Sequence, residues 1–131
     1  MTQTRVVLAD DNTAILAHVQ AVLFPEFEVV GAFSEGESVL SEYDRLQPDV
    51  VVLDISMGKM SGIEVARRLR DTGRQAKIVF LTVHEDQEFV SAAIGAGGSG
   101  YVVKSRMGTD LIDAVHAVLA GRLFISNFMA T

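Results

Sequence analysis

Several short apolar segments of this sequence each end on a polar residue, and together these residues carry the chemistry of one site. They are Asp10 and Asp11 after RVVLA, Asp54 after DVVVL, Thr82 at the end of KIVFLT and Lys104 after YVV. Apolar segments rich in β-branched residues are typical of buried parallel strands, and ligands of open α/β sheets bind at the carboxyl ends of such strands. Carboxylates there favour a hard divalent cation, while a hydroxyl and an ammonium suit a phosphoryl group.

The length and composition of the chain exclude several classes of protein. A chain of 131 residues predicts one domain, and 49% hydrophobic against 21% charged residues argues against disorder. The net charge of −6 argues against direct nucleic-acid binding by this segment, because phosphate contacts need clustered lysine and arginine. The absence of cysteine excludes disulfides and thiolate metal sites.

Hydropathy predicts no contact with a membrane. No apolar run approaches the roughly 20 residues that a membrane-spanning helix needs. The N-terminal MTQTR lacks the apolar core of a secretory signal peptide. We therefore expect a cytoplasmic protein.

Strand and helix patterns alternate along the chain, which predicts parallel strands joined by helical crossovers. The expected strands are Arg5–Ala9, Phe27–Phe33, Val50–Leu53, Lys77–Leu81 and Tyr101–Val103. The expected helices run from the cap Asn12 to Leu23, then over Glu37–Leu46, Gly62–Asp71, Asp86–Ala96 and Thr109–Ala120. The predicted class is α/β, a flavodoxin-like (βα)5 doubly wound parallel sheet with strand order 2-1-3-4-5. In that order the strands that end on functional groups are contiguous.

The pattern of Asp10–Asp11, Asp54, Thr82, Tyr101 and Lys104 resembles the response regulator receiver domain of bacterial two-component signalling. The resemblance covers the chain from Arg5 to Ala120 and includes LDISMGKMSGIEVARRLR around the acceptor aspartate. The segment LTVHEDQEFVSAAIGAGGSGYVVKS is similar to the NarL/FixJ-type branch. We expect residues 1–120 to form the receiver and residues 121–131 to begin a linker or a C-terminal tail.

The resemblance implies a role for each residue of the cluster. Asp54 would accept a phosphoryl group from a sensor histidine kinase. Mg2+ would be bound by Asp11 and Asp54 directly, by Asp10 through water, and by the backbone carbonyl of Ser56.

Lys104 and the Thr82 hydroxyl would contact the phosphoryl oxygens, so Asp54, Thr82 and Lys104 form the expected catalytic set. Thr82 and Tyr101 would form the switch: Thr82 moves inward, and Tyr101 turns from an outward to an inward rotamer. That change would reshape the face built from the fourth helix, the fifth strand and the fifth helix, a possible homodimer surface.

The protein would catalyse only its own phosphorylation and dephosphorylation, and would control transcription through a C-terminal DNA-binding domain absent from this chain.

Other interpretations stay open. The chain could be a stand-alone receiver, or a Mg-dependent phosphatase with an aspartate nucleophile of the haloacid-dehalogenase kind. That class places its nucleophile in a DxD motif after the first strand, where this chain has Asp-Asp-Asn. Residue by residue, Asp10 and Asp11 could merely cap a helix, Lys104 could be a solvated strand end, and Tyr101 could be core packing.

The chain departs from the family pattern at a few positions. Gly58 stands where proline is usual, which predicts a more flexible loop after Asp54. Val83 replaces a smaller residue beside Thr82, and Gly98 replaces a usual alanine. His84 is expected to be a surface loop residue near the mouth of the site.

Overall fold

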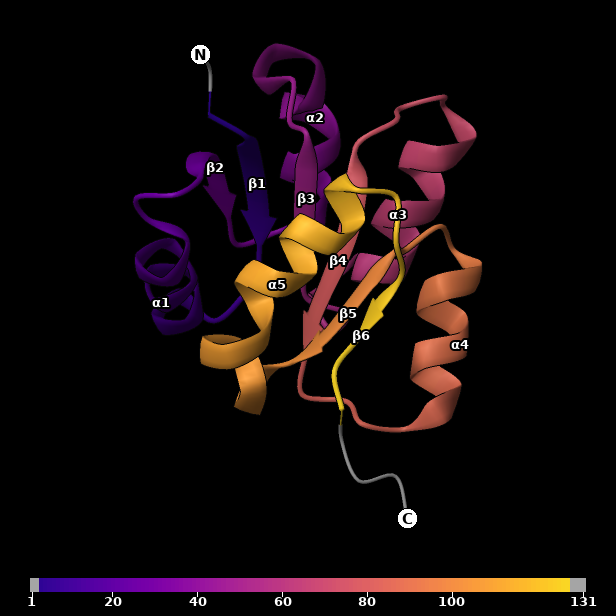
Figure 1. The fold of residues 1–131 in the computed structure, drawn as a ribbon. Helices are drawn as coiled ribbons and strands as arrows, with labels where there is room; N and C mark the ends of the chain where they lie inside the picture. Colours follow the sequence, from indigo (N-terminus) through magenta and orange to yellow (C-terminus); the bar gives the residue numbers. More distant parts are fainter. Residues whose placement is uncertain (1–2, 128–131) are drawn as a thin grey trace.

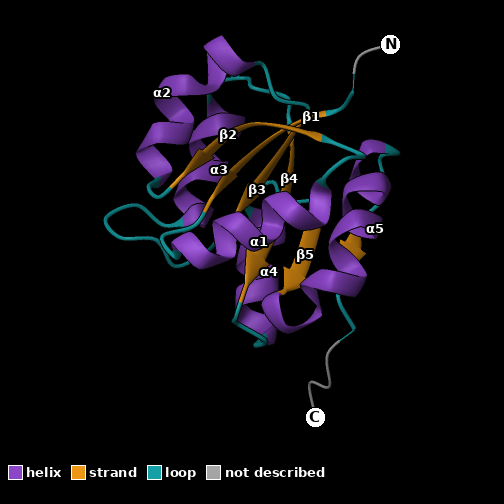
Figure 2. Cartoon of the chain, turned by 90° about the vertical axis from the view of Figure 1, so that its left-hand side faces the viewer, coloured by secondary structure: helices purple, strands orange, loops and turns teal. Residues whose placement is uncertain are grey.

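The computed structural model describes residues 3–127 and contains a parallel sheet with helices on both faces (Figures 1 and 2). The strand order is β2-β1-β3-β4-β5-β6, and every neighbouring pair is parallel. This confirms the predicted order for the first five strands. The strands are β1 (Arg5–Ala9), β2 (Glu28–Phe33), β3 (Val50–Leu53), β4 (Lys77–Thr82), β5 (Gly100–Val103) and β6 (Phe124–Ile125).

Two helices cover one face of the sheet and three cover the other. Helix α1 (Thr13–Leu23) and helix α5 (Met107–Leu119) pack together over the first face. The opposite face is covered by α2 (Gly36–Leu46), α3 (Gly62–Asp71) and α4 (Gln87–Gly95). Over residues 3–127, none of these helices has the length and apolar character needed to span a membrane.

Side-chain caps fix where two of the helices begin. The Asn12 side chain accepts hydrogen bonds from the N–H groups of Ala14 and Ile15, and the Ser61 hydroxyl accepts one from the N–H of Glu64. Each cap satisfies backbone donors that lack a partner within their own helix. Both caps follow strands whose ends carry aspartates, so they also fix the path of the chain as it leaves the carboxyl edge of the sheet.

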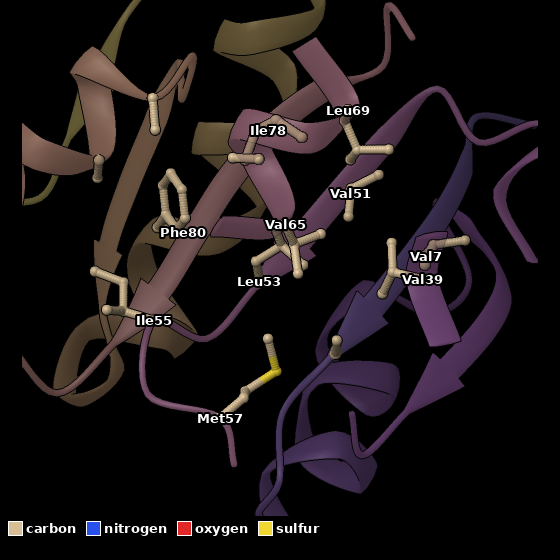
Figure 3. Packing of buried hydrophobic residues seen from close by; sticks show 14 of the residues in the cluster. Val7, Val39, Val51, Leu53, Ile55, Met57, Val65, Leu69, Ile78 and Phe80 are labelled. Carbon is tan, nitrogen blue, oxygen red and sulfur yellow. The ribbon is translucent and has the colours of Figure 1, made fainter. Parts of the chain in front are cut away.

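The core has two layers because the strands are buried on both faces. All four residues of β3 are buried, and alternate residues face opposite layers. Figure 3 shows the layer beneath α2, α3 and α4, where Val51 and Leu53 of β3 pack against Val65 and Leu69 of α3. Ile55 and Met57, in the loop after Asp54, are 3% exposed and belong to the same layer. This packing anchors the loop that follows the predicted acceptor residue.

Two features near the C-terminus were not predicted. A short 3-10 helix, η1 (Lys104–Arg106), leads directly into α5, which begins at Met107 rather than at Thr109. The chain then turns back and adds β6 to the edge of β5. The last segment of the expected linker, residues 128–131, lies outside the described residues.

Candidate functional site

The carboxyl edge of the sheet brings together the residues predicted from the sequence. Asp10, Asp11 and Asp54 each offer a carboxylate oxygen, and these oxygens lie within 4.8 Å of one another. Asp10 and Asp54 are buried, whereas Asp11 is exposed. The sheet ladder continues into the buried pair: the N–H of Asp10 donates to the Phe33 carbonyl, and the N–H of Asp54 donates to the Ala9 carbonyl.

Lys104 lies between the two buried carboxylates. Its Nζ is 2.7 Å from Oδ2 of Asp10 and 3.4 Å from Oδ2 of Asp54. Oδ1 of Asp10 accepts a 2.8 Å hydrogen bond from the N–H of Asn12. Oδ2 of Asp10 is buried, and within residues 3–127 it has the ion pair with Lys104 but no hydrogen bond of normal geometry. A buried carboxylate oxygen of this kind can bind a cation.

The electrostatics of the cluster also favour a cation. Burial raises the pKa of Asp54, and the nearby Asp10 carboxylate raises this pKa further. Lys104 and the N–H of Ser56, which lies 3.3 Å from Oδ1 of Asp54, act in the opposite direction but do not cancel the increase in pKa. A divalent cation would relieve the repulsion between the carboxylates, and Mg2+ prefers such oxygen ligands. The residues present therefore fit a Mg2+ site.

His84 connects more of the site than the sequence indicated. Its Nε2 lies 2.8 Å from the hydroxyl of Ser56, and its ring stacks on Phe89 of α4 with centroids 3.9 Å apart. The N–H of His84 donates to the hydroxyl of Thr82, and its carbonyl accepts a 2.8 Å hydrogen bond from the Tyr101 hydroxyl. His84 lies in a loop as expected, but it is half-buried. Its position two residues after Thr82 was the only signal in the sequence.

The structure holds Tyr101 in the inward position. Its side chain is fully buried, as is Thr82. Burial raises the pKa of Tyr101 to about 12, with further contributions from Asp86 and Glu85. In this buried position the phenol donates to the His84 carbonyl, whereas the outward rotamer was the expected starting position; the change of rotamer stays a prediction.

The face between α4, β5 and α5 is not as open as expected. Gly100 and Tyr101 of β5 pair with Phe124 and Ile125 of β6, so the edge of β5 is covered by the chain itself. Ile125 remains 41% exposed on the new edge. A partner that approached this face would meet β6 rather than β5.

The departures from the family pattern have local explanations in the structure. Gly58 has φ of 44°, a left-handed conformation that proline cannot adopt, so a proline at this position would require a change in the backbone of the loop. At Gly98, an added Cβ would lie 2.5 Å from a ring carbon of Phe80. Val83 is 65% exposed and lines a cavity of about 190 Å³ together with Lys104.

The fold and its carboxyl-edge site correspond to the flavodoxin-like receiver class. A sequence model of the response regulator receiver domain matches residues 6–116. The chain is 33% identical over 123 residues to the transcriptional regulatory protein DegU of Brevibacillus brevis, and 32% identical over 124 residues to the nitrate/nitrite response regulator NarL of Escherichia coli K12. It belongs to the response regulator receiver domain family. These alignments cover 92% and 93% of this chain, but only 52% and 57% of the two relatives.

Solved structures agree with this assignment. A LuxR-family two-component response regulator from Aurantimonas sp. SI85-9A1 superposes with a TM-score of 0.89 at 31% identity, covering 95% of this chain and 91% of that one. The signal receiver domain of the NarL response regulator from Mycobacterium tuberculosis gives a TM-score of 0.87 at 27% identity, covering 93% and 100%. These neighbours are response regulators of the LuxR/NarL group, as the sequence resemblance implied.

Proposed function

We propose that this chain is a phosphorylation-dependent switch that accepts a phosphoryl group on Asp54 from a sensor histidine kinase, with Mg2+. The observation that carries the proposal is the position of Asp54. Its buried carboxylate lies beside Asp10 and Asp11 and 3.4 Å from the Lys104 ammonium. One edge of the sheet thus holds the nucleophile Asp54, the carboxylates that can bind a metal ion, and the Lys104 ammonium that can bind the phosphoryl group.

The chemistry needs little from the protein beyond position and charge. An oxygen of Asp54 forms a bond to phosphorus while the bond from phosphorus to the donor breaks, and the product is an acyl phosphate. Asp11 and Asp54 would hold Mg2+ directly and Asp10 would hold it through water, and the ion would supply positive charge that offsets the charge on the phosphoryl oxygens. The Lys104 ammonium can leave Asp10 to pair with these oxygens, and the Thr82 hydroxyl can donate a hydrogen bond to one of them. The Ser56 carbonyl stays a predicted metal ligand.

Thr82 and Tyr101 remain our proposed switch pair, with His84 between them. The Thr82 hydroxyl accepts a hydrogen bond from the His84 N–H, and the Tyr101 hydroxyl donates to the His84 carbonyl. If Thr82 turns to a phosphoryl oxygen, it releases the His84 N–H, and the loop before α4 is free to shift. Because Tyr101 is already inward, we place the first movement in this loop. A Thr82→Ala variant should accept phosphate but lose most of the shift in the NMR signals of Tyr101.

Phosphorylation of Asp54 is tested by intact-mass spectrometry after incubation with acetyl phosphate and Mg2+. The parent chain should gain one phosphate, and Asp54→Asn should gain none. Asp113→Asn, a change at an exposed acid of α5, is the matched control and should gain phosphate like the parent. Equal labelling of the parent and Asp54→Asn would overturn the assignment.

The biological effect of phosphorylation, control of transcription, stays a proposal. This chain covers only about half of the length of its relatives. DegU is named a transcriptional regulatory protein, and NarL a nitrate/nitrite response regulator. We propose that this receiver, residues 1–120, controls transcription through a DNA-binding part outside this chain and works in the cytoplasm. We also propose that the chain forms a homodimer through the α4–β5–α5 face, in which β6 covers the edge of β5. Sedimentation with and without beryllofluoride tests this homodimer.

A further inference from the structure

Strand β6 is held to β5 by backbone hydrogen bonds and also by the side chain of Ser126, the residue after β6. Ser126, which follows β6, donates its N–H to the Tyr101 carbonyl over 2.8 Å. Its hydroxyl donates to Oδ2 of Asp110 over 2.7 Å and accepts a hydrogen bond from the N–H of Val103 over 3.2 Å. Ser126 is 3% exposed and Asp110, in α5, is 7% exposed. One buried serine thus joins the C-terminal strand, the end of β5 and the first turn of α5.

Arg106 completes this group, and we call Ser126, Asp110 and Arg106 the clasp. The Arg106 guanidinium donates to both oxygens of Asp110, over 2.8 and 3.3 Å. Burial alone would raise the pKa of Asp110, but the hydrogen bonds from Arg106 and Ser126 outweigh burial and lower it. Asp110 is therefore a buried, ionised group whose partners come from two different segments of the chain.

The clasp surrounds the residues that carry Lys104. Val103, which donates to Ser126, directly precedes Lys104, and Arg106 ends the 3-10 helix η1 that Lys104 begins. On the other side, the Lys104 side chain reaches Asp10 and Asp54. The same short segment is therefore attached to the acid cluster at one end and to the C-terminal strand at the other.

We propose that the clasp positions Lys104 for the phosphoryl group, so that docking of the C-terminal strand and ligand binding at Asp54 are coupled. This inference rests on the proposed function of Asp54. A lysine side chain is long and flexible, and a fixed backbone at η1 lowers the cost of holding its ammonium at the site. Coupling between two sites is reciprocal, so a ligand that engages Lys104 must in turn hold β6 more firmly.

The test is the affinity of the full chain for beryllofluoride in the presence of Mg2+, followed by NMR. Ser126→Ala should weaken this affinity about three- to tenfold, which is within the usual range of coupling between sites. Ser105→Ala changes an exposed serine in η1 itself and should leave the affinity unchanged. The affinity for Mg2+ alone should not fall in Ser126→Ala, because Lys104 pairs with the phosphoryl mimic and not with the metal. A fall in both affinities would indicate general loosening and overturn the proposal.

Hydrogen exchange gives the reciprocal measurement. In the parent chain, beryllofluoride should slow exchange of the Phe124 and Ser126 amides, which donate to the carbonyls of Ser99 and Tyr101. If Ser126→Ala fails to fold, Arg106→Gln changes the exposed member of the clasp, and the same loss of beryllofluoride affinity is expected. Equal affinity in the parent and the clasp variant would overturn this inference alone. A parent chain that binds no beryllofluoride would instead overturn the proposed function, and this inference with it.

Discussion

Lys104 extends its ammonium to within 3.4 Å of Asp54 Oδ2 but lies closer to Asp10, at 2.7 Å. The two buried carboxylates share the Lys104 ammonium. The negative charge of Asp54 is therefore only partly neutralised by Lys104. Burial, and then the charge of Asp10, therefore keep the pKa of Asp54 above its ordinary value. In the absence of a metal, ionised Asp54 lowers the stability of the fold.

The first prediction follows from the sign of this pKa shift. Because the pKa of Asp54 is higher in the folded than in the unfolded chain, its stabilising contribution is present below the ordinary value of 3.8 and is lost as the pH rises through the raised pKa. Without Mg2+ at pH 7, Asp54→Asn should therefore melt a few degrees above the parent, about 3 °C for 1 kcal/mol in a chain of this size. Thermal melts at pH 4 and pH 7 test this, and the difference should narrow at pH 4.

Asp113→Asn is the control for this comparison, because it removes an exposed charge from α5 without touching the site. Its melting temperature should follow that of the parent at both pH values. A parent chain more stable than Asp54→Asn at pH 7 would show that Lys104 compensates Asp54 fully.

The second prediction concerns Mg2+. A cation bound by Asp10, Asp11 and Asp54 should stabilise the parent by roughly 1.4–2.7 kcal/mol at ten to a hundred times its Kd. Asp11→Ala removes the exposed ligand and should abolish most of this gain, whereas Asp113→Ala should keep it. Melts with and without Mg2+ measure both. Equal gains in the parent and Asp11→Ala would place the metal elsewhere.

The sequence predicted the position of the acid cluster because strand ends are easy to recognise. Asp10 and Asp54 each follow an unbroken apolar run, and such runs are buried on both faces of a parallel sheet. Once the strand order is known, the strand ends meet at one edge of the sheet. The strand order therefore explains why Lys104 and Asp10 lie at the same edge, but the ion pair between their side chains was not predicted.

Contacts that depend on loop paths could not be predicted in this way. Strand β6 is only two residues long, so Phe124 and Ile125 carry no periodic pattern. The bridge from His84 to Ser56 depends on two loops that leave different strands, and no local pattern fixes their separation. In the clasp, Arg106 and Asp110 have the i,i+4 spacing of a local pair, but the contact of Asp110 with Ser126 depends on the path of the C-terminal segment.

The third prediction concerns the buried phenol of Tyr101. Its pKa is raised to about 12, so its stabilising contribution is intact below pH 10 and is lost as the pH rises toward 12. Tyr101→Phe removes the hydrogen bond to the His84 carbonyl and should cost about 1 kcal/mol near pH 7. Urea unfolding at pH 7, 10 and 11 should show the parent losing its advantage over Tyr101→Phe at the highest pH. A constant difference would contradict the burial of an ionisable phenol here.

The last prediction compares two glycines near the end of α4. At Gly98, a Cβ would lie 2.5 Å from a ring carbon of Phe80 and 2.9 Å from the Ala93 carbonyl oxygen. Gly98→Ala should therefore cost about 1–3 kcal/mol, because Phe80 is buried in the core and cannot easily move. A Cβ at Gly95, the last residue of α4, would meet nothing within 4 Å.

Gly95→Ala should accordingly stabilise the chain by up to about 1 kcal/mol, because alanine loses less conformational entropy than glycine when a helix forms. The two substitutions add the same methyl group three positions apart in the chain, and we expect opposite signs because only the methyl at position 98 meets the Phe80 ring and the Ala93 carbonyl oxygen. Urea unfolding of both variants, side by side with the parent, measures the difference. A Gly98→Ala variant as stable as Gly95→Ala would show that both the Phe80 ring and the backbone at Ala93 can move aside. The usual family residue, alanine, would then be compatible with this core.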